Sequence, residues 1–160
     1  AIVEAKDIGI ETTIAGITRS RDLIVQIIDS INEQVEIQDP EKGSIKMAKT
    51  GIVISDKPTN PKANAKNIAV TKELFFDRSP CGTGTSGKLA TLFAKGELDL
   101  GQTFIAESVI GSLFHARLVQ EVDVGGKKAV EPELTGRVFI TGMHQFAIDP
   151  DDPIKYGYVL

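Results

Sequence analysis

Residues 77–88 have the sequence DRSPCGTGTSGK and contain the only cysteine of the chain, Cys81. Ahead of them, apolar runs at residues 67–70 and 74–76 predict strand. After them, apolar residues recur at helical spacing as far as Gly96, which predicts a helix and its end. The chain therefore passes from a strand through a glycine-rich turn into a helix. The free N–H groups at the start of that helix favour a carboxylate or a phosphate at the turn, and they favour the thiolate form of a cysteine placed there.

One interpretation of the glycines is dinucleotide binding. Gly82, Gly84 and Gly87 satisfy the pattern G-x-G-x-x-G between a predicted strand and a predicted helix. Glu107 lies about 20 residues further on, where this motif places the acidic residue that binds a ribose. The pattern after Glu107 is almost all strand, whereas a dinucleotide-binding unit continues with alternating strands and helices. The surrounding pattern therefore disfavours this interpretation.

A second interpretation is a phosphate loop. Gly82, Gly87 and Lys88 match G-x-x-x-x-G-K, but Leu89 stands where the motif needs a serine or threonine to hold Mg²⁺. Without that hydroxyl the metal loses a ligand, and no apolar strand ending in aspartate follows at a suitable distance. The match to a phosphate loop is therefore incomplete.

The third interpretation starts from Cys81. A thiol at the start of a helix is a candidate base or nucleophile, and glycines beside it supply bare backbone for the close approach of a ligand. The alternative is that Cys81 is a small apolar residue in a turn, which is the usual role of a single cysteine. The residue pattern leaves both alternatives open, and the flanking glycines and hydroxyls favour the functional one.

Residues 77–86, Asp-Arg-Ser-Pro-Cys-Gly-Thr-Gly-Thr-Ser, resemble the second active-site signature of the proline racemase family. That family also contains the 4-hydroxyproline epimerases and the trans-3-hydroxyproline dehydratases. More loosely, residues 1–10 resemble the opening of the second half of a family member, and residues 148–158 resemble its C-terminal end. The family's first signature, Met-Cys-Gly-His, is absent, because neither Met47 nor Met143 is followed by cysteine. The resemblance thus covers the whole chain but only the second half of a family member.

The resemblance implies cofactor-independent racemisation or epimerisation at the α-carbon of proline or 4-hydroxyproline, with no metal. Two acid–base groups on opposite faces of the Cα remove a proton and return one. Cys81 would supply one thiol, and the missing N-terminal half would carry the other base. The N–H groups of Gly82 and Thr83, with the Thr83 hydroxyl, would hold the substrate carboxylate, and Asp77 would bind the ring NH₂⁺. The family's dehydratases usually carry threonine at the position of Cys81, so a cysteine there favours a racemase or an epimerase.

A function of another class is also open. The chain could be a stable half-domain that binds a small carboxylate at the helix start and catalyses nothing alone, because one thiol cannot invert a centre efficiently. Protection of Cys81 from alkylation by an anion, without turnover, would distinguish this alternative. Since family members are commonly dimers, a homodimer is a further expectation.

The overall composition disfavours several classes of partner. The chain has 18 basic and 22 acidic side chains and no basic block, which disfavours nucleic acid and anionic membrane surfaces. A single cysteine excludes an intrachain disulfide, and no zinc-ligand pattern is present. No signal peptide and no apolar run of about 18 residues is found, so we expect a soluble, cytoplasmic protein.

Periodicity predicts two helices combined with a sheet. The clearer helix covers residues 20–35, where isoleucines recur at spacings of three and four. Further strands are predicted at residues 1–5, 51–55, 103–110, 113–124, 127–130 and 137–148, with strand or loop at 9–18 and an exposed loop at 56–65. Gly125 and Gly126 lie between two alternating runs and predict a hairpin turn.

These elements predict one α/β domain, residues 1–160, with a strongly bent and mostly antiparallel sheet. The resemblance implies a more specific form, a barrel-like sheet around the central helix at residues 83–94, as in a diaminopimelate epimerase-like half. His115 and His144 fall within predicted strands. Either could act as a base at neutral pH, and we favour a structural role with a local partner for both.

Overall fold

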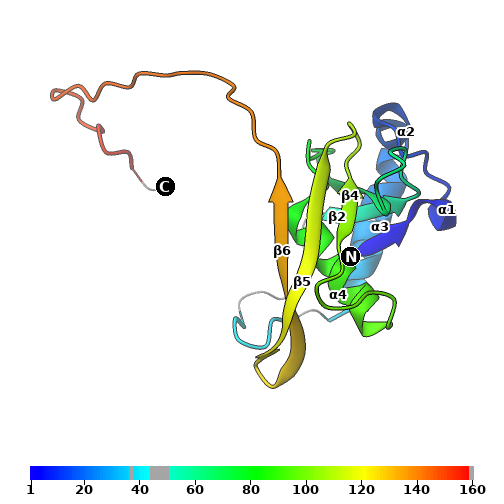
Figure 1. Cartoon of the computed structure of the whole chain (residues 1–160). Coiled ribbons are helices and arrows are strands. Elements are labelled where there is room, and N and C mark those ends of the chain that lie inside the picture. The colour runs from blue at the N-terminus through cyan, green and yellow to red at the C-terminus, as the bar shows by residue number, and fades with distance from the viewer. Residues whose placement is uncertain (37, 44–50, 159–160) are drawn as a thin grey trace.

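The computed structural model describes residues 1–36, 38–43 and 51–158 of the chain (Figure 1). Its strands are β1 (Ile2–Glu4), β2 (Gly51–Asp56), β3 (Ala65–Thr71), β4 (Phe104–Glu107), β5 (Leu113–Val124) and β6 (Lys127–Gly136). Its helices are α1 (Ala5–Ile8), α2 (Ile14–Arg19), α3 (Arg21–Gln34) and α4 (Gly82–Ala94). Within the described residues, no helix combines the length and the apolar character needed to span a membrane.

The six strands form one mixed sheet in the order β1-β2-β3-β4-β5-β6. The pairs β1–β2 and β3–β4 are parallel, and the other three pairs are antiparallel. The predicted barrel-like closure is wrong, because β1 and β6 are the two edges of the sheet and do not pair with each other. β1 is only three residues long, so it could pair with only a short part of the ten-residue β6.

Alternation along β2 and β3 gives this part of the sheet two faces with different partners. One face packs against α2 and α3 through a cluster of buried aliphatic side chains: Ile17, Ile24, Ile28, Ile52, Ile54, Ile68 and Val70. The other face carries Val53 and Ser55, and both lie against α4.

The helix α4 lies between the two parts of the sheet. It contacts β1 and β3 on one side and β5 and β6 on the other. Leu89 of α4 belongs to a second, separate apolar cluster. The other buried members of this cluster are Ala65, Leu98, Phe104, Ala106, Ala116 and Leu118. The sheet that contacts this helix through four of its strands remains open.

Two of the predicted elements match the structure closely. The helix predicted at residues 20–35 is α3, and Ile24 and Ile28 of its apolar stripe are at most 1% exposed. The hairpin predicted at Gly125 and Gly126 joins β5 and β6, and both glycines have positive φ angles. A left-handed backbone costs glycine little, which explains the pair at this turn.

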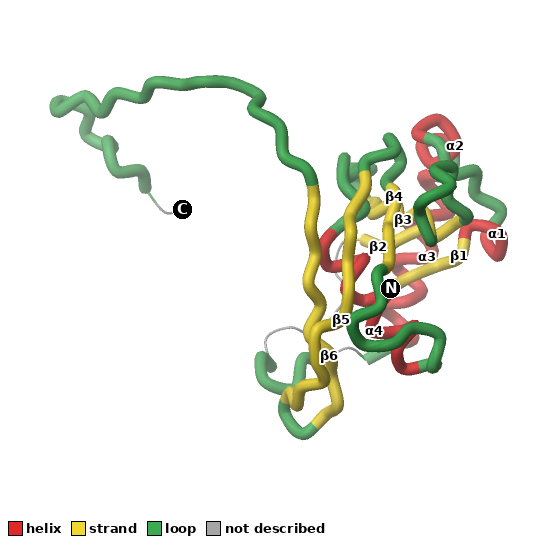
Figure 2. The backbone as a smooth tube through the Cα atoms, in the orientation of Figure 1, coloured by secondary structure: helices red, strands yellow, loops and turns green. Residues whose placement is uncertain are grey.

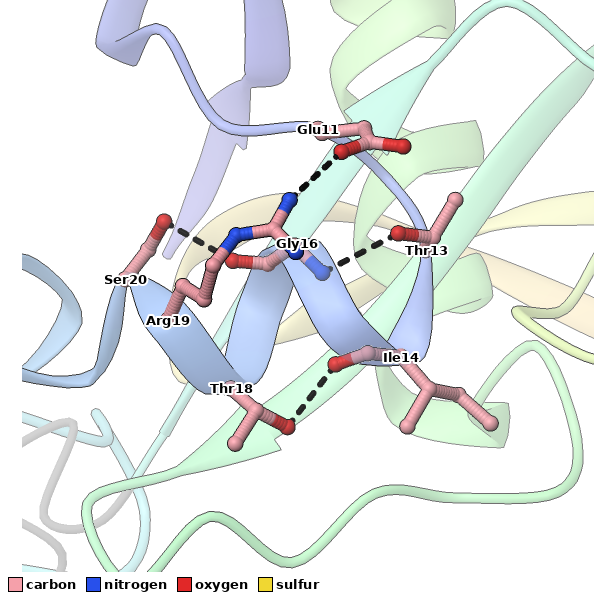
Figure 3. A network of polar contacts seen from close by, with 7 residues as sticks. All are labelled: Glu11, Thr13, Ile14, Gly16, Thr18, Arg19 and Ser20. Carbon is pink, nitrogen blue, oxygen red and sulfur yellow. Dashed lines mark hydrogen bonds and ion pairs between the residues drawn. The ribbon is translucent and has the colours of Figure 1, made fainter.

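The prediction of strand or loop for residues 9–18 holds for residues 9–13, which are loop, and is wrong for residues 14–18, which belong to α2. Thr13 caps the helix, and its Oγ1 accepts the N–H of Gly16 at 3.0 Å (Figure 3). At the other end, Ser20 Oγ donates to the Gly16 carbonyl at 2.9 Å. These local side-chain bonds satisfy the helix ends and outweigh the β-propensity of the threonines and isoleucines.

Gly16→Ala is expected to destabilise the protein, although alanine is normally the better helix former. A Cβ at Gly16 would meet the carbonyl oxygen of Glu11 and would lie 2.7 Å from its Cβ. Because backbone cannot yield as a flexible side chain does, we expect a loss of about 1–3 kcal/mol in urea unfolding. Gly87→Ala is the control, because there a Cβ meets only Ile2 Cδ1 at 3.9 Å. Equal stabilities of the two variants would contradict this packing argument.

Two other strand predictions are wrong. Residues 74 and 75 are irregular, and Phe76 makes only a single bridge with Val70. Residues 137–148 are not strand either, and they run away from the body of the protein as an exposed segment (Figure 2). A strand needs a hydrogen-bonding neighbour, and neither segment finds one along its length within the described residues. The prediction at residues 127–130 is too short, because β6 continues to Gly136.

Candidate active site

The turn ahead of α4 holds Cys81 in a backbone conformation that is unusual for a residue with a Cβ. Cys81 is the N-cap of the helix, with φ 66° and ψ 119°. Ser79 Oγ accepts the Cys81 N–H at 3.2 Å, and the Cys81 carbonyl accepts the N–H of Thr85 at 2.9 Å. Non-glycine residues held in the left-handed region cluster at functional sites, so the conformation itself supports a role for this cysteine.

The thiol of Cys81 lies at the start of the helix. Its Sγ accepts the N–H of Gly84 at 3.3 Å, in the place where N-caps usually carry a serine or threonine oxygen. The side chain is partly exposed. Unpaired N–H groups at a helix start favour negative charge, so both the sulfur and a bound anion are well placed here.

A buried threonine ties the turn to the helix. Thr85 is fully buried, and its Oγ1 donates to the carbonyl of Pro80 at 3.2 Å. Pro80 is itself buried under the turn. The proline restricts the backbone just ahead of Cys81 and the threonine bond holds it, so the cysteine is presented by a rigid support.

Gly84 allows the start of α4 to lie directly on β2. A Cβ at this position would come within 2.5 Å of Val53 Cγ2 and 3.4 Å of Cys81 Sγ. The glycine pattern alone suggests bare backbone for a ligand at this point. The structure shows instead that Gly84 is buried, and that its missing side chain makes room for the neighbouring strand.

A depression of about 540 Å³ opens beside the thiol. Asp77, Cys81 and Thr83, three of the four residues assigned to the site from the sequence, line it together. Gly82, the fourth, is exposed at the first position of α4 and does not line the depression. The remaining wall comes from Ala1, Ile2, Gly51, Ile52, Val53, Ala69, Val70, Thr71, Phe75, Gly84 and Gly87. This volume falls within the range of about 300–1,000 Å³ that is usual for small-molecule sites.

Sequence reasoning missed Phe75 as a member of this wall. The ring is 72% exposed and lies in the apolar run that was predicted as strand. The signal in the sequence was an aromatic residue in a short apolar run directly before the signature at residues 77–86.

Lys88 and Glu107, the charged residues of the phosphate-loop and dinucleotide-binding interpretations, both form hydrogen bonds within the fold. Lys88, the lysine of the incomplete phosphate loop, donates to Glu4 Oε1 at 2.8 Å and Ser55 Oγ at 3.1 Å, and so ties α4 to β1 and β2. Glu107 is 4% exposed, and its Oε2 accepts the N–H groups of Thr59 at 2.6 Å and Asn60 at 3.0 Å. Both charged groups therefore hold the fold together in this structure.

Neither histidine lines the depression beside Cys81. His115 is exposed on β5, and His144 lies in the exposed segment after β6. Among the described residues, no three His, Cys, Asp or Glu side chains gather closely enough to hold a metal ion. The chemistry that this site can offer from its own side chains is that of Cys81 and Asp77 beside a helix start.

Comparison with known proteins agrees with the signature around Cys81. The sequence model of the family described as "Proline racemase" matches residues 1–159. The proline racemase of Acetoanaerobium sticklandii is 42% identical over all of this chain, and the match covers 48% of that protein. The trans-3-hydroxy-L-proline dehydratase of Bacillus thuringiensis subsp. konkukian is 34% identical over the same 160 residues, again 48% of its length.

A solved structure shows the same fold. The crystal structure of a hydroxyproline epimerase from Agrobacterium vitis with bound trans-4-hydroxy-L-proline superposes with a TM-score of 0.77 at 32% identity. The superposition covers all of this chain and 45% of that one, and the chain spans about half the length of the curated relatives it matches. The family match extends over almost every residue, so the chain belongs to the proline racemase family.

Proposed function

We propose that this protein takes part in the cofactor-independent inversion of the α-carbon of proline or 4-hydroxyproline, with Cys81 as one of two acid–base groups. Asp77 would bind the ring NH₂⁺ of the substrate, and the N–H groups of Gly82 and Thr83 would bind its carboxylate. The chain would form one domain that corresponds to the C-terminal half of a two-domain enzyme. The other half would carry the second base.

One observation carries the proposal. Cys81 Sγ lies at the start of α4, hydrogen-bonded to the N–H of Gly84, in a depression that Asp77 and Thr83 also line. A helix start favours the substrate carboxylate, and an aspartate nearby favours a cationic ring nitrogen. The zwitterion of a cyclic amino acid therefore has a complementary place beside the thiol.

The chemistry needs two groups because the two hydrogens exchanged lie on opposite faces of the Cα. A thiolate on one face takes the α-proton, and the electron pair that remains is delocalised into the carboxylate. A thiol on the opposite face then gives a proton back to the Cα. The two bases end the cycle with their protonation states exchanged, and no electrons leave the substrate. Fixed N–H donors at the carboxylate stabilise the enediolate-like charge between the two steps.

Proton NMR in D₂O tests the proposal directly. The protein would be a fusion in which the part of the A. sticklandii racemase outside the match precedes Ala1, and the 160-residue chain would be measured beside it. With L-proline or trans-4-hydroxy-L-proline, we expect the fusion to lose the α-proton signal and to invert the optical configuration. We expect the chain alone to give no inversion, because it supplies one thiol. A fusion inactive on both substrates would contradict the proposed activity. Inversion by the chain alone would contradict the proposal that the two halves each supply one base.

The same experiment separates the nearest alternatives. Loss of water from trans-3-hydroxy-L-proline would indicate the dehydratase reaction named for the B. thuringiensis relative. Protection of Cys81 from alkylation by proline, without any exchange in the fusion, would indicate a half-domain that only binds a carboxylate. Cys81 favours the racemase or epimerase, by the resemblance already described.

A further inference from the structure

Two serines in the turn between β4 and β5 form a pair of hydroxyl groups. Ser108 Oγ and Ser112 Oγ lie 2.7 Å apart, and Ser112 Oγ also donates a hydrogen bond to the carbonyl oxygen of Arg78. Arg78 lies in the turn that leads to Cys81, and Ser112 follows it by 34 residues in the sequence. The serine pair therefore joins the sheet to the turn that carries the proposed site.

The direction of the hydrogen bond within the pair follows from the partners of each hydroxyl. A serine hydroxyl has one hydrogen to donate and two lone pairs that accept. The single hydrogen of Ser112 goes to the Arg78 carbonyl, so Ser108 is the donor in the contact between the two hydroxyls. Ser108 Oγ in turn accepts the N–H of Ile110 at 3.3 Å and that of Ser112 at 3.1 Å. The Ser108 hydroxyl is then fully used, and it orients the Ser112 hydroxyl toward Arg78.

The turn that carries the two serines is closely held. Ser108 is fully buried, and its N–H donates to the Ser112 carbonyl at 2.9 Å. The N–H of Gly111 donates to the Ser108 carbonyl at 3.0 Å, and Gly111 has a φ of 82°, which costs a glycine little. On either side of the turn, Glu107 and Leu113 are partners in the pairing of β4 with β5. Ser112 is therefore a fixed point on the sheet.

The Arg78 carbonyl is the point at which the turn before α4 is attached to this fixed point. Among the described residues, no other hydrogen bond joins residues 78–81 to a part of the chain outside the turn and α4. The bonds that Cys81 and Thr85 make stay within residues 79–85. Those local bonds fix the shape of the backbone around the thiol, but they do not fix the path of the residues ahead of it.

Asp77 is the site residue whose position depends most on this attachment. It lies directly between Phe76, which makes a bridge with Val70, and Arg78, whose carbonyl Ser112 holds. Its side chain is exposed, and it lines the depression together with Cys81. Without the bond from Ser112, the backbone of Asp77 would be tied to the sheet on one side only.

We propose that Ser112 is a positioning residue, which holds Asp77 in place relative to Cys81 through the Arg78 carbonyl, with its hydroxyl oriented by Ser108. The inference rests on the proposed function for the role of Asp77 as the partner of the substrate's ring cation. A carboxylate that contacts this cation in the ground state and in the transition state contributes equally to binding both. Its displacement therefore raises KM more than it lowers kcat.

Trypsin digestion of the 160-residue chain tests the attachment without a measurement of activity. The side chain of Arg78 is exposed, and the carbonyl of the bond to be cut is the one that Ser112 holds. We expect Ser112→Ala to raise the rate of cleavage after Arg78 at least about tenfold, because proteases cut backbone that opens locally. Cleavage after Lys88 is the reference for opening of the whole fold, because the next residue, Leu89, is fully buried.

Ser112→Thr is the matched control, because it retains the hydroxyl and should keep the parent rate of cleavage after Arg78. An unchanged rate after Arg78 in Ser112→Ala would overturn the proposal. An equal increase after Lys88 would also overturn it, since Ser112 would then support the fold in general.

Kinetics of the fusion test whether the attachment acts through Asp77. We expect Ser112→Ala to raise the KM for proline or 4-hydroxyproline at least about fivefold and to keep kcat within about threefold, whereas Ser112→Thr should keep both. A loss of folded protein would instead lower the apparent kcat at an unchanged KM. The proline concentration that half-protects Cys81 from alkylation should rise in parallel with KM. In an Asp77→Asn background, Ser112→Ala should not raise that concentration further, and an equal rise in both backgrounds would overturn the proposal.

The inference and the proposed function fail separately. Faster cleavage after Arg78 in Ser112→Ala, with no α-proton exchange in the parent fusion, would support the attachment and contradict the activity. Normal exchange in the parent fusion, with an unchanged KM in Ser112→Ala, would leave the proposed function intact and overturn the role of Ser112.

Discussion

Cys81→Ser is expected to lower the rate of α-proton exchange in the fusion by about 10²–10⁴-fold, the usual contribution of one acid–base group. The hydroxyl of serine is a far weaker acid than a thiol, so the variant cannot supply the thiolate that takes the proton. The fold should survive, because serine is a preferred N-cap and its oxygen can accept the Gly84 N–H that now donates to Sγ at 3.3 Å. The variant therefore separates catalysis from stability.

The measurement is the loss of the α-proton signal in D₂O, with thermal unfolding of the same sample. Ser86→Ala is the control in the same helix, because Ser86 Oγ donates only to the Gly82 carbonyl at 2.8 Å and lies outside the lining of the depression. We expect the control to keep its rate within about threefold, as for a surface substitution that leaves the site geometry unchanged. A Cys81→Ser variant as active as the parent would refute the assignment of Cys81 as a base.

Gly84→Ala should damage the site although Cys81 itself is retained. The added Cβ would come within 2.5 Å of Val53 Cγ2, so the start of α4 must move away from β2. A displacement of about 1 Å at a reacting group can cost about 10²-fold in rate, and we expect a loss of that order. Overpacking of this kind should also lower the free energy of unfolding by about 1–3 kcal/mol.

A second substitution distinguishes the clash from a general defect. Val53→Ala in the Gly84→Ala protein removes the methyl that the new Cβ would meet, so the double variant should recover part of both losses. Gly87→Ala, one turn along the same helix, has room for its Cβ and should leave the free energy of unfolding unchanged or slightly raised. If the two substitutions are additive, Gly84 and Val53 are not coupled and the packing explanation is wrong.

The local order of elements could be predicted from the sequence where short-range patterns decide it. The apolar stripe of α3, the glycine pair between β5 and β6 and the passage through a turn into α4 at Cys81 are all encoded in neighbouring residues. Membership of the proline racemase family was also predictable, because the signature at residues 77–86 is contiguous, and the comparisons confirm it. The roles of Cys81, Asp77, Gly82 and Thr83 remain predictions for the experiments above.

Only the tertiary structure decided which predicted segments form helices or strands. It also decided which residues the charged side chains and the glycines contact. Residues 137–148 are predicted as strand but have no neighbour to pair with in the described part of the chain, and residues 14–19 are β-prone but are capped into a helix. Gly84 makes room for Val53, and Lys88 joins α4 to two strands. Helix and strand propensity, apolar spacing and turn chemistry depend on residues that are neighbours in the sequence, so they can be predicted from the sequence alone. Pairing, close packing and the partner of a buried charge depend on residues that are distant in sequence, and only the folded arrangement brings those together.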